Sequence, residues 1–161
     1  MKNKDSIRWC TDQPRGLTMM EPNPNMPKSY LGMAEESIIA LSNLGSSRIW
    51  TAAATYYAFY YSLYAVMLRM GFRCEIHSCS ISFMRTYLTG YYNKDDIRMM
   101  RQAFDNRNDL QYYADRTVDE DRIAECKRYC KDFFIRTKDI LIRMKEEDIL
   151  KIRERFTQET R

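Results

Sequence analysis

From residue 28 to residue 145, apolar side chains recur every three or four positions, which is the spacing that forms one face of an α-helix. Residues that favour turns interrupt this pattern and divide it into five segments. The segments predict four main helices, at about residues 28–44, 47–70, 94–113 and 119–145, and one short helix at about residues 77–89. Helices of these lengths, joined by short connections, predict an all-α fold, an antiparallel up-and-down helical bundle.

The second predicted helix has no charged residue between Arg48 and Arg69, a length that would span a bilayer. It contains five tyrosines, however, and phenol groups in the middle of a membrane lack hydrogen-bond partners. We therefore interpret this segment as the buried central helix of a bundle. Because it is apolar nearly all round, it needs more cover than three short neighbours give, and we expect a homodimer.

The two ends of the chain differ from this central part. All four prolines lie within residues 1–27, which predicts an irregular strap laid over the bundle. Residues 28–145 form the predicted bundle, and residues 146–161 are dominated by charge. We expect this last segment to be a solvated helical tail that frays, although Ile149, Ile152 and Phe156 could instead pack on a partner.

Composition supports a single helical domain without deciding its function. A chain of 161 residues is long enough for one core, and five glycines among 13% aromatic residues leave few helix breakers. The net charge of +4 results from 26 basic and 22 acidic residues. This mild excess permits a nucleic acid as a partner but does not require one.

Five cysteines and a polar N-terminus unlike a secretory signal peptide predict reduced thiols in a cytoplasmic protein. An alternative is a zinc site made from Cys74, His77 and Cys79 with the pair Cys126 and Cys130, which shares one helix face. Their spacings match no common zinc module. We therefore expect no metal and no cofactor.

Polar residues interrupt the apolar face of the third main helix, at residues 94–113. The stripe proceeds in steps of three and four residues and ends in an arginine and a glutamine: Ile97, Met100, Phe104, Arg107 and Gln111. A buried guanidinium without a partner is costly, so Arg107 predicts a partner or a wet cleft. The alternative is a structural arginine that bridges two helices.

Two motifs resemble those of prokaryotic HEPN domains: Thr-Tyr-Tyr-Ala-Phe-Tyr at residues 55–60 and Arg-Asn-Asp-Leu-Gln-Tyr-Tyr at residues 107–113. The resemblance extends over about residues 28–142 and includes the connector at residues 74–78. The chain is similar to the small HEPN proteins that are often encoded beside a minimal nucleotidyltransferase. The resemblance implies a helical bundle that dimerises, a role in a toxin-antitoxin or defence-type system, and metal-independent cleavage of RNA.

By this resemblance, Arg107 binds the scissile phosphate and Asn108 orients it. Where the family has a histidine, this chain has Tyr112 or Tyr113, and a phenol with a pKa near 10 is a poor general base. We therefore expect weak or absent nuclease activity. His77 could act as a substitute base, or it could be an exposed or capping residue. RNA or nucleotide binding is expected at Arg107, Gln111 and Tyr112.

A different class of function is also open. The chain could be a non-catalytic regulatory partner of a minimal nucleotidyltransferase, binding a nucleotide through Arg107. By resemblance, Tyr112 or Tyr113 would then be the residue that the transferase modifies. A third interpretation is a scaffold in which the tyrosine-rich helix is only a core element.

Helix geometry constrains how Arg107 and Tyr112 are used. They are five positions apart, about 140° around a regular helix, so we expect them not to face one pocket of a single straight helix. Either the helix loosens near Tyr112, or a twofold axis brings Arg107 of two chains to a shared groove. We favour the second, with an interface lined by the helices at residues 47–70 and 94–113.

Overall fold

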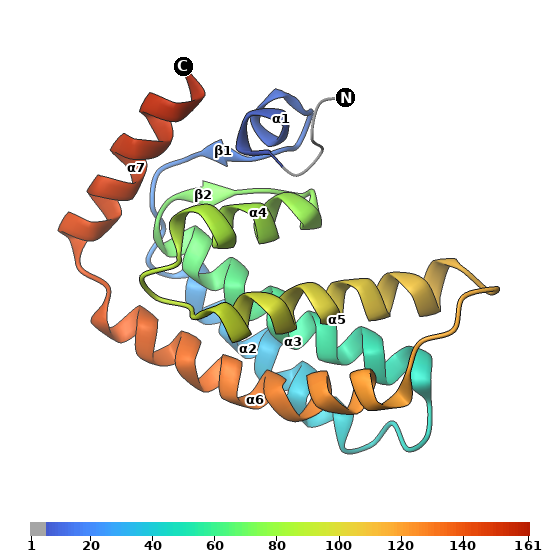
Figure 1. Cartoon of the computed structure of the whole chain (residues 1–161). Coiled ribbons are helices and arrows are strands. Elements are labelled where there is room, and N and C mark those ends of the chain that lie inside the picture. The colour runs from blue at the N-terminus through green and yellow to red at the C-terminus, as the bar shows by residue number, and fades with distance from the viewer. Residues whose placement is uncertain (1–5) are drawn as a thin grey trace.

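The computed structural model describes residues 6–161, and most of them are helical (Figure 1). The elements follow in the order α1 (Ile7–Asp12), β1 (Thr18–Met19), α2 (Met26–Leu41), α3 (Arg48–Arg69), β2 (Phe72–Arg73), α4 (His77–Tyr87), α5 (Lys94–Tyr112), α6 (Glu120–Arg143) and α7 (Glu146–Thr160). The all-α fold class is confirmed, and α2 to α6 correspond to the five predicted helices.

Helix α3 is the centre of the molecule, as predicted, and it packs against α2, α5 and α6. Its N-cap is Ser47, whose hydroxyl accepts a hydrogen bond from the Trp50 amide at 3.4 Å. The chain leaves the helix at Gly71, whose φ of +76° favours glycine. The first turn, residues 48–50, is exposed, and from Thr51 to Arg69 the side chains are buried except for the half-buried Ala54, Tyr57, Tyr61 and Arg69.

Helix α5 begins with a capping box that also attaches it to α6. The Asn93 side chain accepts from the Asp96 amide at 2.8 Å, and the Asp96 carboxylate accepts from the Asn93 amide at 2.9 Å. Asp96 is fully buried and also accepts hydrogen bonds from Tyr129 at 2.9 Å and Arg136 at 3.1 Å. This network fixes the direction in which α5 leaves its first turn.

The C-terminal segment differs from the solvated tail that we expected. Helix α7 is folded, with Ile149 and Phe156 buried, and the Phe156 ring lies 5.0 Å from the Phe72 ring of β2. Arg153 donates from one Nη1 atom to three backbone carbonyls, those of Met20 at 3.0 Å, Met70 at 2.9 Å and Gly71 at 3.0 Å. Ile149 and Phe156 face the rest of their own chain, so the prediction of a solvated, fraying tail is wrong.

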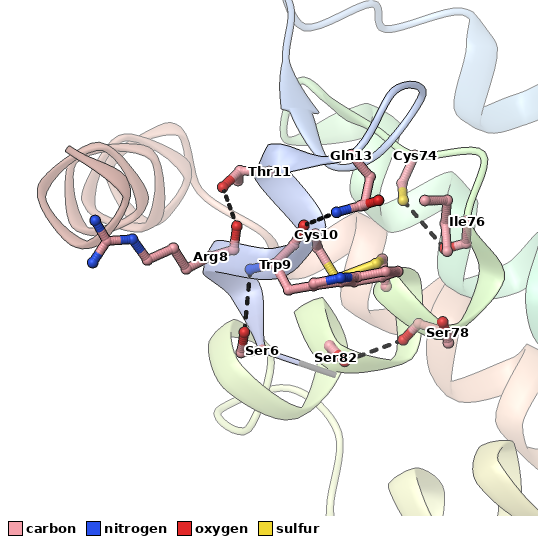
Figure 2. The surroundings of a disulfide bond; sticks show 11 residues. Ser6, Arg8, Trp9, Cys10, Thr11, Gln13, Cys74, Ile76, Ser78 and Ser82 are labelled. Atoms are coloured by element: carbon pink, nitrogen blue, oxygen red, sulfur yellow. Dashed lines mark hydrogen bonds between the residues drawn. A yellow bond between two sulfur atoms is a disulfide. The ribbon is translucent and has the colours of Figure 1, made fainter. Parts of the chain in front are cut away.

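The N-terminal strap carries more regular structure than its prolines indicated. Its described part, residues 6–27, forms α1 and the strand β1, which pairs antiparallel with β2 (Thr18 opposite Arg73). A disulfide between Cys10 and Cys79 joins α1 to α4 (Figure 2). The expectation of reduced thiols is therefore wrong for this pair. Residues 1–5 of the predicted strap lie outside the described residues.

The disulfide also removes a ligand from the alternative zinc site. Cys79 is bonded to Cys10, whereas Cys74, Cys126 and Cys130 are buried free thiols. Within residues 6–161, no cluster of three or more histidine, cysteine or acidic side chains is arranged to hold a metal ion. The cysteine and histidine spacing in the sequence therefore does not correspond to a shared site in the fold.

In the same range, no helix combines the length and the apolar character required to cross a membrane. Helix α3 was the segment that raised this question. Its tyrosines are used in ring contacts within the bundle, such as that between Tyr60 and Tyr64 at 5.5 Å.

Candidate functional site

Arg107 lies on the buried side of α5 and only 9% of its surface is exposed. Its guanidinium carbon is 5.2 Å from the ring centroid of Tyr56, 5.5 Å from that of Tyr57 and 5.2 Å from that of Tyr112. Nη2 donates to the Tyr112 hydroxyl at 3.0 Å and, more weakly, to the Tyr57 hydroxyl at 3.4 Å, while Nη1 donates to Asn108 Oδ1 at 3.1 Å. All of these partners are neutral.

The acidic residues nearest in sequence do not neutralise Arg107. Asp105 pairs with Arg101, and Asp109 pairs with Arg116. The Nε atom of Arg107 is buried and lacks a hydrogen-bond partner within the described residues. No carboxylate of the described residues therefore offsets the charge of the guanidinium, in a setting where water screens that charge poorly.

His77, the first residue of α4, lies beside the same tyrosines. Its Nδ1 atom is 2.7 Å from the Tyr56 hydroxyl, and its ring stacks on Tyr60 with centroids 4.1 Å apart. Burial, and then the charge of Arg107, lower the pKa of His77 from 6.5 to about 4. His77 is therefore neutral at pH 7. The interpretation of His77 as an exposed or capping residue is wrong, because its ring is packed and Ile76 occupies the N-cap position.

Tyr56 connects the arginine to the histidine. Its ring contacts Arg107 while its hydroxyl bonds His77, and burial raises the pKa of this phenol well above 10, so that it stays protonated. If the hydroxyl donates to Nδ1, the imidazole proton is on Nε2. If the hydroxyl accepts from Nδ1, Nε2 is left free to take a proton. We call Arg107, Asn108, Tyr56, Tyr57, Tyr112 and His77 the Arg107 cluster.

The contact between Arg107 and Tyr112 contradicts our expectation that the two could not share a pocket within one chain. Tyr112 is the last helical residue of α5, and Tyr113 already has an extended backbone. The two long side chains reach around the helix end, so that the Tyr112 hydroxyl meets the guanidinium. Because Tyr112 is 64% exposed, it forms an outer cover over a buried charge.

The other two predicted site residues lie beside this cluster. The Tyr113 ring makes a cation–π contact with Arg116, whose guanidinium carbon is 3.6 Å from the ring centroid. Gln111 and Tyr113 line an open cavity of about 790 Å³ between the C-terminal end of α5 and the N-terminal end of α3. Tyr112 also lines this cavity and thus belongs to both places.

Tyr56 and Tyr57 were missed as site residues, although they lie in one of the motifs. The sequence contained a signal for them, because an arginine on the core face of one helix requires hydrogen-bond acceptors from a neighbouring helix. Helix α3 has no carboxylate and presents several phenols. The position of His77 could not be predicted from the sequence, because it depends on how α4 packs against α3.

The cluster combines an unneutralised cation with a neutral imidazole. A carboxylate or phosphate group could replace the neutral acceptors around Arg107. Its charged oxygens would form stronger hydrogen bonds with the guanidinium. With a pKa near 4, His77 is a weak base as long as the site holds no anion.

Comparison of the chain with protein-family models, curated proteins and solved structures finds no match.

Proposed function

We propose that the Arg107 cluster binds a phosphodiester group of single-stranded RNA and supports slow, metal-independent cleavage of that RNA, as the resemblance to HEPN domains implies. The observation that carries this proposal is the buried Arg107 guanidinium, which has no carboxylate partner among residues 6–161 and shares Tyr56 with a neutral histidine. A purely structural arginine would be expected to pair with an acidic group or with backbone carbonyls, as Arg136 and Arg153 do.

Phosphate binding requires that Arg107 exchange its present partners. The hydroxyl of Tyr112 and the amide oxygen of Asn108 occupy the Nη atoms, and two phosphate oxygens can replace them in a bidentate arrangement. Tyr112 is exposed and stands at the end of α5, so its side chain can rotate without disturbing the core. Tyr56 and Tyr57 would stay beneath the guanidinium.

The bound phosphate would also change His77. The charge of Arg107 is one of the two causes that lower the pKa of His77, and an anion on Arg107 offsets that charge. His77 thereby becomes a better base only when RNA is present. In the proposed reaction, the 2′-hydroxyl transfers its proton to His77 as its oxygen attacks the phosphorus. The 5′-oxygen of the next nucleotide leaves and takes a proton from water, which gives a 2′,3′-cyclic phosphate and a 5′-hydroxyl.

The test combines fluorescence anisotropy with a labelled single-stranded RNA and a cleavage assay in the presence of a chelator. We expect Arg107→Met to weaken binding at least tenfold. Arg98→Met is the matched control, because Arg98 lies on the exposed side of the same helix. His77→Gln should retain binding and lose cleavage.

Two results would contradict the proposal. Unchanged RNA affinity in Arg107→Met would remove the phosphate site. Cleavage that survives both Arg107→Met and His77→Gln would assign the activity to other residues or to a contaminant, and binding without any cleavage by the unmodified protein would contradict the nuclease half alone.

A second candidate function is favoured by the exposure of the motif tyrosines. Tyr112 is 64% and Tyr113 is 44% exposed, so a partner enzyme can reach both hydroxyls. If the chain is the regulatory partner of a minimal nucleotidyltransferase, incubation with such an enzyme and ATP should add the mass of a nucleotide. Tyr112→Phe or Tyr113→Phe should abolish the addition, and an unchanged mass would contradict this candidate.

A further inference from the structure

The cavity beside the Arg107 cluster has a lining of mixed character. Ile49 of α3 and Leu110 of α5 supply apolar surface, Tyr112 and Tyr113 supply aromatic rings, and Arg48 and Arg116 supply positive charge. A volume of about 790 Å³ lies within the range of small-molecule binding sites. Of the Arg107 cluster only Tyr112 lines this cavity, so the cavity is a separate site beside the cluster.

The two arginines of the cavity are already neutralised, in contrast to Arg107. Arg48 donates to the Val118 carbonyl and pairs with Glu120 at 3.5 Å, and Arg116 pairs with Asp109. A second phosphate would therefore compete with existing carboxylates. The cavity suits a neutral, flat group better than an anion.

Tyr113 and Arg116 together form a platform for such a group. The guanidinium carbon of Arg116 lies over one side of the Tyr113 ring, 3.6 Å from its centroid, and the pairing of Arg116 with Asp109 holds it there. Aromatic rings and guanidinium planes are the surfaces on which proteins stack unpaired nucleobases. The Gln111 side chain, which also lines the cavity, offers both a donor and an acceptor to the edge of a base.

The position of Tyr112 connects the two places. Its hydroxyl bonds Arg107 and its ring lines the cavity, so a phosphate at Arg107 and a group in the cavity are separated by one side chain. A nucleotide has this composition, an anionic phosphate joined to a neutral base through a sugar.

We propose that this cavity is a base-binding subsite, which takes an unpaired nucleobase next to the phosphate held by Arg107, so that the ligand is single-stranded and not duplex RNA. This inference rests on the proposed function. It adds the element of the ligand that is recognised besides the backbone. In a duplex the base is paired and stacked, and it cannot enter a cavity of this kind without being extruded.

The test uses three labelled probes of equal length: a single-stranded RNA, the same backbone with abasic positions, and a duplex. The unmodified protein should bind the single-stranded RNA most tightly. Tyr113→Leu should weaken binding of that probe about fivefold or more, because it removes a stacking surface, and should leave the abasic probe unaffected. Tyr91→Leu is the matched control, because it removes a tyrosine at the turn between α4 and α5, outside the cavity.

The outcomes separate this inference from the proposed function. Equal affinity of the unmodified protein for all three probes, or unchanged affinity of Tyr113→Leu for single-stranded RNA, would overturn the base subsite while Arg107→Met still tests the phosphate site. If Tyr113→Leu weakens binding and Arg107→Met does not, the cavity binds the base and the phosphate proposal fails. Circular dichroism of each variant checks that the fold is retained, which is expected because Tyr113 lies on the surface.

Discussion

At Arg107 the protein buries a positive charge among phenols and an amide, and the desolvation of that charge opposes folding. Three tyrosine rings offset part of the cost, at about 0.5–2 kcal/mol for each favourable cation–π contact. Arg136 is different, because it pairs with the fully buried Asp96 at 3.1 Å. The two arginines therefore predict opposite responses to the same substitution.

We expect Arg107→Met to leave the free energy of unfolding unchanged or to raise it, since methionine fills the space without a charge to desolvate. Arg136→Met should lower the free energy of unfolding, because it leaves the Asp96 carboxylate without its cation. Urea denaturation of both variants measures the difference. A loss of more than about 2 kcal/mol in Arg107→Met would identify Arg107 as a structural residue.

His77 gives a prediction for pH. Its pKa is about 4 in the folded protein and 6.5 is its ordinary value, so the unfolded chain binds more protons between these pH values. The contribution of His77 to stability is therefore complete above pH 6.5 and decreases as the pH falls towards 4. Comparing the free energy of unfolding at pH 7 and pH 4.5 should show a larger loss in the unmodified protein than in His77→Gln.

The same residue can be followed directly, because the chain has one histidine. Its ring protons should titrate near pH 4 in an NMR experiment, and their midpoint should rise when an RNA ligand binds at Arg107. A midpoint between 6 and 7 in the protein alone would show that the ring is solvated and is not held against Tyr60.

The sequence indicated Arg107 because its position on an apolar stripe could be read from local periodicity. It did not indicate that His77 lies beside Tyr56, since 21 residues and a change of element separate them. The error about Tyr112 had a different cause. The 140° separation around the helix was treated as excluding a shared pocket, whereas the two long side chains reach around the end of α5 and meet.

At the scale of elements, local signals in the sequence predicted helices α2 to α6. Asn93 and Asp96 begin α5 with a capping box, and Gly71 follows the end of α3. Helix α1 also has a capping serine, Ser6, but the prolines that follow it led us to expect irregular structure. Helix α7 was predicted as a helix, but its burial depends on partners far away in the chain. Phe156 packs against Phe72, and no local sequence pattern predicts this contact.

The disulfide between α1 and α4 closes a loop of 69 residues. Loss of such a crosslink is expected to lower the free energy of unfolding by about 2–4 kcal/mol, because the unfolded chain gains freedom. Urea denaturation with and without a reductant measures this effect. The double variant Cys10→Ala/Cys79→Ala is the control, and its stability should not respond to reductant.

Both sulfur atoms belong to fully buried residues, so the bond should resist reduction until the region around α1 opens. An unmodified protein whose stability is the same in reductant and oxidant would contradict the crosslink. It would instead restore the expectation of free thiols.

At the scale of the whole molecule, α2, α5 and α6 cover most of α3 but leave one stripe open. Trp50 is 60% exposed, and Tyr57 and Tyr61 on the same stripe are half-buried. The argument from sequence that α3 needs further cover is consistent with this stripe. The dimer itself stays a prediction.

We expect light scattering at micromolar concentration to give about twice the chain mass of 19.3 kDa. Trp50→Glu should shift the protein towards the monomer, because it places a charge in the open stripe. Ile142→Glu on α6 is the control, since Ile142 is also exposed but lies on another helix. A monomer under these conditions would contradict the dimer prediction. The Arg107 cluster would then bind its ligand within a single chain.

The backbone at Gly71 limits which mutations can accumulate at one corner of the molecule. A Cβ atom at Gly71 would lie 2.3 Å from Arg153 Nη1 and 2.5 Å from the Met20 carbonyl oxygen. The Arg153 side chain can move away, but the Met20 carbonyl belongs to the backbone, and the φ of +76° strains any larger residue at position 71. Gly71 should therefore persist in descendants of this sequence, whereas replacement of Arg153 would release three carbonyls without making a larger residue at position 71 acceptable.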